Sequence, residues 1–218
     1  MIGFADTNNC LVRKVSAATG FISTLAGTPP DLTGLLHCGD SGDGGLATNA
    51  KVGFANGLAL DGSGNIFIVD PSSCILRKIS ASTAIISAVA GTAGSCGYSG
   101  DGTEATSAQL NQPYGVAADG SGNLFIADTL NCVIREVSSS NAQISIIAGD
   151  NSIGCGYSGD GALPTSTRFN QPYDVAVDSS GNIFVADYNN SAIREVSASN
   201  GNISTFAGVA LPSPIHLP

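Results

Sequence analysis

The stretch Gly-Asn-Ile-Phe-Val-Ala-Asp-Tyr-Asn-Asn-Ser-Ala-Ile-Arg-Glu-Val, residues 181–196, decides the fold because the chain repeats its pattern. Similar apolar runs end at Asp6, Asp70 and Asp128, at intervals of about 60 residues, and an Arg follows each Asp seven residues later. A period of this size, built from short apolar runs, indicates stacked supersecondary units that bury a core only together.

Each complete copy contains four short runs rich in β-branched residues and bounded by Gly, Asn, Asp or Ser, which is typical of strands joined by turns. Because the connections are too short for helical crossovers, the four strands should form an antiparallel meander. Repeated sheets of this kind are the blades of a β-propeller, so we predict an all-β fold. We expect one domain over residues 1–218, with blades at about 1–30, 55–91, 113–149 and 172–208, the first lacking its opening strand.

The quoted stretch and its three relatives resemble the NHL repeat family across almost the whole chain. In the extended bacterial type of this repeat a Ser-Gly-Asp-Gly loop follows strand four, and residues 41–44, 99–102 and 158–161 match it. The resemblance implies a propeller that usually closes with six blades, which at this period needs about 350 residues. We therefore expect about 3.75 blades of a larger propeller; the alternative is a closed four-bladed ring in which residues 215–218 supply the missing opening strand.

Composition excludes several classes of function. The net charge is −9 with only 8 Lys and Arg, whereas nucleic-acid binding needs clustered cations, so we expect no nucleic-acid partner. No stretch approaches the roughly 20 apolar residues of a membrane span, so we expect no membrane insertion within this chain. No signal peptide is visible at the N-terminus.

The six cysteines fall in two registers of the repeat. One register lies three residues before each Arg and the other just before each Ser-Gly-Asp-Gly loop, and both should lie on one face of the propeller. Pairing within a copy uses all six, whereas pairing with the next copy leaves Cys10 and Cys155 without partners. We predict three disulfides and hence an extracellular or cell-surface location, with buried reduced cysteines as the alternative. The predicted bridges are Cys10–Cys38, Cys74–Cys96 and Cys132–Cys155.

Charged residues recur in every copy, which favours a structural role because one catalytic centre needs distinct groups. Each Asp and the Arg seven residues later should be diagonal neighbours across a hairpin. We interpret them as structural ion pairs, namely Asp6/Arg13, Asp70/Arg77, Asp128/Arg135 and Asp187/Arg194. Asp43, Asp101 and Asp160 belong to the Ser-Gly-Asp-Gly loops, which we interpret as tight turns because they lack the full ligand spacing of a calcium loop.

Aromatic residues supply the binding candidates. Tyr114 and Tyr173 precede opening strands, which line the central channel of a propeller, and Asn56 occupies the same place in the second copy. Exposed Tyr is common in recognition surfaces, although Tyr packed between blades is an equal alternative. The candidate rim residues are Asn56, Tyr98, Tyr114, Tyr157 and Tyr173.

These observations favour a non-catalytic binding scaffold that presents a loop-rich face to a protein or glycan partner. The acidic balance favours a cationic or neutral partner, and further blades could come from missing sequence or another chain. We expect no catalytic residues, no cofactor and no metal. The alternatives are a metal-dependent enzyme of the lactonase or lyase type, implied by some six-bladed relatives, or a sensor module of a larger membrane protein.

Overall fold

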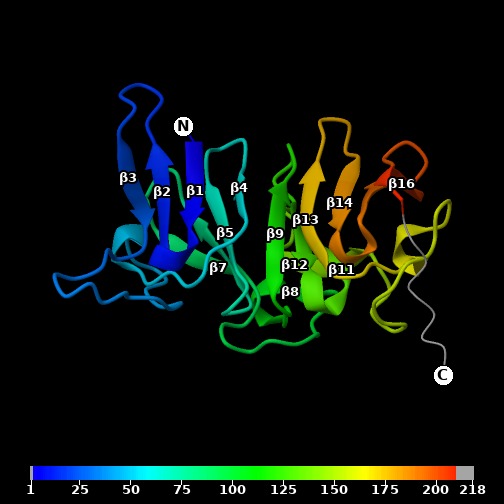
Figure 1. Ribbon diagram of the computed structural model, residues 1–218, viewed down its shortest axis with the longest axis horizontal. Coiled ribbons are helices and arrows are strands. Elements are labelled where there is room, and N and C mark those ends of the chain that lie inside the picture. Colours follow the sequence, from blue (N-terminus) through cyan, green and yellow to red (C-terminus); the bar gives the residue numbers. More distant parts are fainter. Residues whose placement is uncertain (1, 210–218) are drawn as a thin grey trace.

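The computed structural model describes residues 2–209 and contains four antiparallel sheets arranged side by side in a row (Figure 1). Each sheet is one blade, and we number the blades 1 to 4 along the chain. Blade 1 consists of β1 (Ile2–Asp6), β2 (Leu11–Val15) and β3 (Ile22–Ala26). Blade 2 consists of β4 (Leu58–Leu60), β5 (Ile66–Asp70), β6 (Ile75–Ile79) and β7 (Ile86–Ala90).

The last two blades have longer opening strands. Blade 3 consists of β9 (Pro113–Ala118), β10 (Leu124–Asp128), β11 (Val133–Val137) and β12 (Gln143–Ala148). Blade 4 consists of β13 (Pro172–Val177), β14 (Ile183–Asp187), β15 (Ala192–Val196) and β16 (Ile203–Gly208). Both are meanders of neighbouring strands, as the short connections predict.

The opening strands β4, β9 and β13 lie next to one another along the inner side of the row (Figure 1). Glycine allows the close approach between the first two, because a Cβ at Gly57 would lie 2.6 Å from the Tyr114 carbonyl oxygen. Gly115 lies against Asp174 in the same way. The opening strands therefore depend on glycine for their close approach at their starts.

A short loop joins the second and third strand of each blade. In blade 3 this loop is a 3₁₀ turn, η4 (Thr129–Asn131), and in blades 1 and 4 it is η1 (Thr7–Asn9) and η6 (Tyr188–Asn190). The residue after each turn has a positive φ, 57° at Cys132. That conformation reverses the chain and begins the next strand, as the residue at the end of a Schellman-type turn does.

Three long interblade loops connect the blades: loop A (residues 27–57), loop B (91–112) and loop C (149–171). Each loop runs along the outer edge of the blade that follows it. Loop B contributes β8 (Thr103–Glu104), which pairs with β12, and Leu46 of loop A bridges to Ile85. In loop C the Gly161 N–H donates to the Ile203 carbonyl. The loops thus cover strand edges that would otherwise be open to pairing with another chain.

The hydrophobic core lies between blades rather than within one. Phe67, Val69 and Leu76 of blade 2 pack against Leu124 and Ile126 of blade 3, all of them buried. Equivalent clusters join blade 1 to blade 2 and blade 3 to blade 4. A single blade could not bury these residues alone, which agrees with the repeat prediction.

The row of blades is open. Blade 1 and blade 4 lie at its opposite ends, so the described residues form a partial propeller and not the closed four-bladed ring that was the alternative (Figure 1). Residues 215–218, which that alternative used as the missing opening strand, lie outside the described residues. No helix within residues 2–209 is long and apolar enough to cross a membrane.

Candidate functional site

Three disulfides hold the start of each interblade loop, and they confirm the predicted pairing. Cys10–Cys38, Cys74–Cys96 and Cys132–Cys155 have Cα–Cα separations of 5.2, 5.3 and 5.4 Å. Each bridge joins the loop between strands two and three to the loop that leaves strand four of the same blade. All three bridges therefore lie on the face of the molecule where the opening strands begin, and we call this the disulfide face.

A buried arginine holds the middle of each loop to the next blade. The Arg135 side chain is fully buried, and its Nη2 donates to the Asp101 carboxylate at 2.8 Å and to the Ser99 carbonyl at 2.9 Å. Its Nη1 donates to the Gln109 carbonyl at 2.9 Å. A charge-assisted pair surrounded by backbone acceptors is the arrangement that compensates a buried guanidinium.

The same clamp occurs in blades 2 and 4. Arg77 bonds to Asp43 through Nε and Nη2, and Arg194 Nη2 lies 2.8 Å from Asp160 Oδ1. Sequence analysis assigned these three Asp residues to tight turns and missed their partners. The signal was present, because every loop Asp precedes its Arg by 34 residues.

The predicted Asp–Arg pairs are weaker than this clamp. Their nitrogen–oxygen separations are 3.7 Å for Arg13–Asp6, 3.7 Å for Arg135–Asp128 and 3.6 Å for Arg194–Asp187. In each of these blades an Asn three residues after the Asp donates to its carboxylate instead, as Asn131 does to Asp128 at 2.9 Å.

The predicted pair Asp70/Arg77 is wrong, because the two side chains form no ion pair in the structure. Blade 2 has Ser73 where the other blades have Asn, and the Asp70 carboxylate accepts hydrogen bonds from Ser72 and the Ser73 N–H. The Arg77 guanidinium is then directed to Asp43 and to two carbonyls of loop A.

Burial changes the acidity of the Asp residues in the hairpins. Desolvation raises the pKa of Asp128 to about 6, although hydrogen bonds from Asn111 and Asn131 and the charge of Arg135 act in the opposite direction. Desolvation likewise raises the pKa of Asp187. Both carboxyl groups are fully buried.

Two of the five rim candidates belong to the arginine clamps. The Arg135 guanidinium carbon lies 5.3 Å from the centre of the Tyr98 ring, and Arg194 lies 4.8 Å from the Tyr157 ring. The Tyr98 hydroxyl donates to Asp101, and the Tyr157 hydroxyl lies 3.0 Å from Asp160. The structure thus assigns Tyr98 and Tyr157 contacts that cover the buried guanidinium groups.

The other three candidates lie together. Tyr114 and Tyr173 stack with ring centroids 4.5 Å apart, and Asn56 occupies the same repeat position in blade 2. We call these three residues the tyrosine rim. Tyr188 extends it with a ring centroid 5.7 Å from Tyr173, and it was not among the sequence candidates. Its side chain is 66% exposed and Tyr173 is 38% exposed, so the aromatic surface faces solvent.

The backbone that carries the rim is unusual. Gln112 and Gln171, two residues before each rim Tyr, have φ of 47° and 53°. Non-glycine residues rarely adopt this region, and the following Pro fixes the next φ. The Thr129 hydroxyl of blade 3 donates to the Pro172 carbonyl at 2.8 Å. The two tyrosines are therefore held by backbone constraints before any ligand arrives.

Two adjoining depressions share Asn56 and Tyr114. One, of about 340 Å³, is lined along the opening strands by Gly57, Val116, Tyr173 and Asp174. The other, of about 300 Å³, includes Phe54, Pro71 and Gln112. Asp174 stands where the preceding blades have glycine, and partial burial raises the pKa of its carboxyl group.

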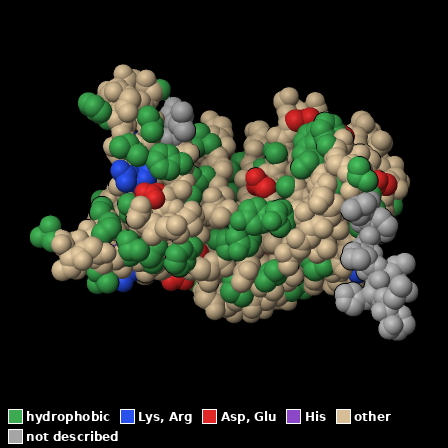
Figure 2. Space-filling view, viewed as in Figure 1, with side chains coloured by type: hydrophobic (Ala, Val, Ile, Leu, Met, Phe, Trp, Pro, Cys, Tyr) green, Lys and Arg blue, Asp and Glu red, His purple; other side chains and the backbone are tan. Residues whose placement is uncertain are grey.

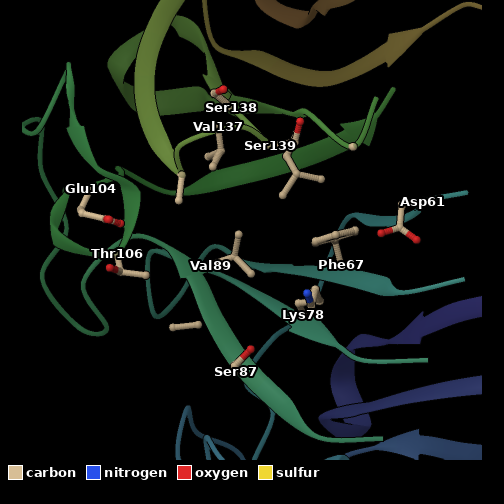
Figure 3. Close-up of a pocket in the computed structure, with 14 residues that line it drawn as sticks. Asp61, Phe67, Lys78, Ser87, Val89, Glu104, Thr106, Val137, Ser138 and Ser139 are labelled. Atoms are coloured by element: carbon tan, nitrogen blue, oxygen red, sulfur yellow. The ribbon is translucent and has the colours of Figure 1, made fainter. Parts of the chain in front are cut away.

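A third cavity lies between blades 2 and 3, at the strand ends opposite the disulfides. It has a volume of about 450 Å³, with Phe67, Val89 and Val137 directed into it (Figure 3). Asp61, Lys78 and Glu104 lie around its border. The corresponding position in blade 3 is Ile147.

Comparison with known proteins identifies the type of repeat in this chain. Residues 169–195 match the NHL repeat family. Suppressor of Quenching 1, a chloroplastic protein of Arabidopsis thaliana, is 30% identical over 144 residues, which cover 66% of this chain and 13% of that protein. The chain therefore spans a small part of this relative.

Solved structures show the same fold at low sequence identity. An auxiliary nutrient binding protein from Bacteroides ovatus has a TM-score of 0.65 at 16% identity, over 94% of this chain and 46% of that one. A streptogramin B lyase has a TM-score of 0.56 at 12% identity, over 94% of this chain and 50% of that one. The chain thus spans about half of each, and the likeness concerns the fold alone.

Proposed function

We propose that this chain, a partial β-propeller built from NHL repeats, is a non-catalytic binding scaffold that holds a protein or glycan partner on its disulfide face. The observation that carries the proposal is the tyrosine rim, in which Tyr114 stacks on the exposed Tyr173 beside depressions of about 340 and 300 Å³. Tyrosine offers a large contact area with a polar group at its end and little loss of side-chain entropy.

Rigidity of the rim supports the proposal. The positive φ at Gln112 and Gln171 costs free energy that the surrounding structure must supply, and such conformations concentrate at ligand sites. The disulfide Cys74–Cys96 and the Gln112 N–H, 3.5 Å from Cys74 Sγ, hold the same segment. A surface ordered before binding loses less entropy when a partner docks.

The disulfides also support a location outside the reducing cytosol. All six cysteines are paired, and disulfides persist mainly in secreted and surface proteins. We therefore place the scaffold at the cell surface or outside the cell. Its net charge of −9 favours cationic or neutral partners.

The second candidate, an enzyme of the lactonase or lyase type, has Asp174 in its favour. Its carboxyl group lies on the concave wall with a pKa raised by burial, which is a property of catalytic acids. Residues 2–209 contain no group of three or more His, Cys, Asp or Glu side chains that could hold a metal ion. The described residues do not fit the metal site of such enzymes, and we derive no reaction step through a metal.

The test is ligand binding by the wild type and by Tyr114→Ala/Tyr173→Ala. Both proteins would be screened against a glycan microarray and a displayed random-peptide library, and hits would be measured by calorimetry. We expect ligands of one class, with the dissociation constant raised at least about tenfold in the double variant.

Tyr98→Phe is the matched control, because it changes a tyrosine of the arginine clamp and keeps the ring over Arg135. The proposal fails if neither panel contains a ligand, or if the control weakens binding as much as the double variant does. Turnover of a lactone by the wild type, abolished in Asp174→Asn, would favour the second candidate instead.

A further inference from the structure

The depression of about 300 Å³ on the disulfide face lies where the chain departs from its own repeat. Phe54 lines it, at the position that Gln112 and Gln171 occupy before the next two blades. Its side chain is 49% exposed, although blades 2 and 3, which form most of the walls, each have a blade on both sides (Figure 1). An aromatic side chain is thus kept at the surface inside the row of blades.

A second departure from the repeat lines the same depression. In the hairpins of blades 1 and 3 a threonine hydroxyl donates to a carbonyl of the next blade, from Thr7 to Ala55 and from Thr129 to Pro172, both at 2.8 Å. Blade 2 has Pro71 at that position. Because proline has no hydroxyl, this hairpin cannot form the bond, and an apolar ring lines the depression instead.

The amide side chains of the depression are available to a ligand. Asn56 and Gln112 are exposed, and within residues 2–209 neither side-chain amide is hydrogen-bonded to another residue. Each amide offers two N–H donors and one carbonyl acceptor. Tyr114 adds a partly exposed ring that ends in a hydroxyl. The depression therefore combines hydrogen-bonding groups with two aromatic rings, one from blade 2 and one from blade 3.

No charged residue lines this depression. Asp70, which precedes Pro71 in the chain, is 3% exposed and accepts hydrogen bonds from Ser72 and Ser73. Figure 2 shows few charged side chains on the side of the molecule that it draws, and hydrophobic ones gathered over the middle of the row of blades. An ionic ligand would lose hydration here without gaining a counter-ion, so the site suits a neutral ligand.

We infer that the depression holds one pyranose ring of a neutral glycan, an inference that rests on the proposed binding function and names its ligand class. The faces of a pyranose carry C–H groups, which the negative faces of the Phe54 and Tyr114 rings attract. Its edge carries neighbouring hydroxyls, which both donate and accept as the amides of Asn56 and Gln112 do. The volume lies at the lower end of the range of small-molecule sites, about 300–1,000 Å³.

The experiment tests Phe54→Gln and the wild type on a microarray of neutral and acidic oligosaccharides and on the displayed peptide library. Calorimetry follows with the neutral oligosaccharide that binds most strongly. Phe54→Gln introduces the residue of the other copies, so circular dichroism should show an unchanged fold. We expect it to raise the dissociation constant at least about tenfold, because one ring face is removed. Asn56→Ala should raise it about fivefold through the lost hydrogen bonds.

Gln171→Asn is the matched control, because it changes the repeat position of Phe54 at blade 4, lines neither depression, and keeps a residue that tolerates positive φ. It should bind as the wild type does. Glycan binding that Tyr114→Ala/Tyr173→Ala weakens but Phe54→Gln does not would overturn this inference and leave the scaffold standing. Binding of acidic glycans or peptides alone, or equal weakening by the control, would do the same. An absence of ligands from both panels would instead overturn the proposed function itself.

Discussion

Loop A and loop B each compensate a buried arginine of the blade that follows, but they use different residues. In loop B, Asp101 shares Arg135 with Asp128, and Tyr98 covers the guanidinium. In loop A, Asp43 is the sole carboxylate within ion-pair distance of Arg77 among the described residues. Loop A also has Asp40 at the position of Tyr98. The element common to both is the Asp–Arg clamp, so the clamp is what the architecture requires and the remaining contacts are additions.

A second difference between the two loops concerns the residue beside the hairpin Asp. Loop B has Asn111, whose N–H donates to Asp128 at 2.7 Å, while loop A has Gly53 at that position. The Asp70 carboxylate lies against Gly53, where a Cβ would come within 2.0 Å of its oxygen. Asp70 thus occupies space that a side chain at position 53 would fill, and Asp43 alone compensates the buried charge of Arg77.

The largest expected effect is at Asp43. Asp43→Asn should lower the free energy of unfolding by about 4 kcal/mol, because it leaves the buried Arg77 charge without a carboxylate. Asp101→Asn should cost about half as much, on the order of 2 kcal/mol, since Arg135 keeps Asp128. Urea denaturation of both variants measures the difference. Equal losses would show that Asp128 does not share the charge of Arg135.

The disulfides give the next largest effect. Cys74→Ser/Cys96→Ser opens a loop of 22 residues and should destabilise the protein by about 3 kcal/mol in the chain-entropy model. The bridge Cys10–Cys38 spans 28 residues, so its removal should cost nearly the same. Limited proteolysis can compare the two variants. Loop A in the variant without Cys10–Cys38 should be cut faster than loop B in the variant without Cys74–Cys96, because no aromatic ring of loop A covers Arg77 as Tyr98 covers Arg135. Similar cleavage rates would show that Tyr98 does not help to hold loop B against blade 3.

The hairpin carboxylates differ in acidity, and this difference can be titrated. The folded pKa of Asp128, about 6, exceeds the ordinary value of about 3.9, so the folded state binds more protons between these pH values. Its contribution to stability should therefore fall as the pH rises from about 4 to 6 and stay constant above. Asp128→Asn should lack this slope when its pH profile is subtracted from that of the wild type.

Carboxyl carbon NMR shifts provide the control for that titration. Asp178 is exposed in a turn, and hydrogen bonds from the Asn182 side chain and backbone lower its pKa. Its midpoint should lie below 3.8, whereas that of Asp128 should lie near 6. A midpoint for Asp128 at or below that of Asp178 would mean that Arg135 and the hydrogen bonds outweigh desolvation.

The smallest expected effect concerns the tyrosine cover of the clamp. Tyr98→Phe removes the hydroxyl bond to Asp101 and keeps the ring over Arg135, so it should cost about 1 kcal/mol. Replacing Asp40 of loop A by Tyr tests the reverse change and should stabilise the protein by a similar or smaller amount. Thermal unfolding of the two single variants measures both. A loss on Asp40→Tyr would show that loop A cannot place an aromatic ring over Arg77.

Local chemistry alone determined much of this protein. The repeat interval, the turn residues and the short β-branched runs predicted repeated antiparallel sheets, and the structure contains four of them. The cysteine count predicted the three disulfides, because within-copy pairing is the arrangement that uses all six. The blades follow from short stretches of sequence and the disulfides from the number of cysteines, so a single sequence is sufficient to predict both.

Contacts between blades were decided only by the tertiary structure. Asp101 meets Arg135, and Tyr98 lies over it and not in the tyrosine rim, because loop B crosses the outer edge of blade 3. The stacking of Tyr114 on Tyr173 likewise depends on how closely β9 and β13 approach through Gly115. Such contacts join residues dozens of positions apart, and their geometry is fixed by the packing of whole sheets, which a repeat pattern does not specify.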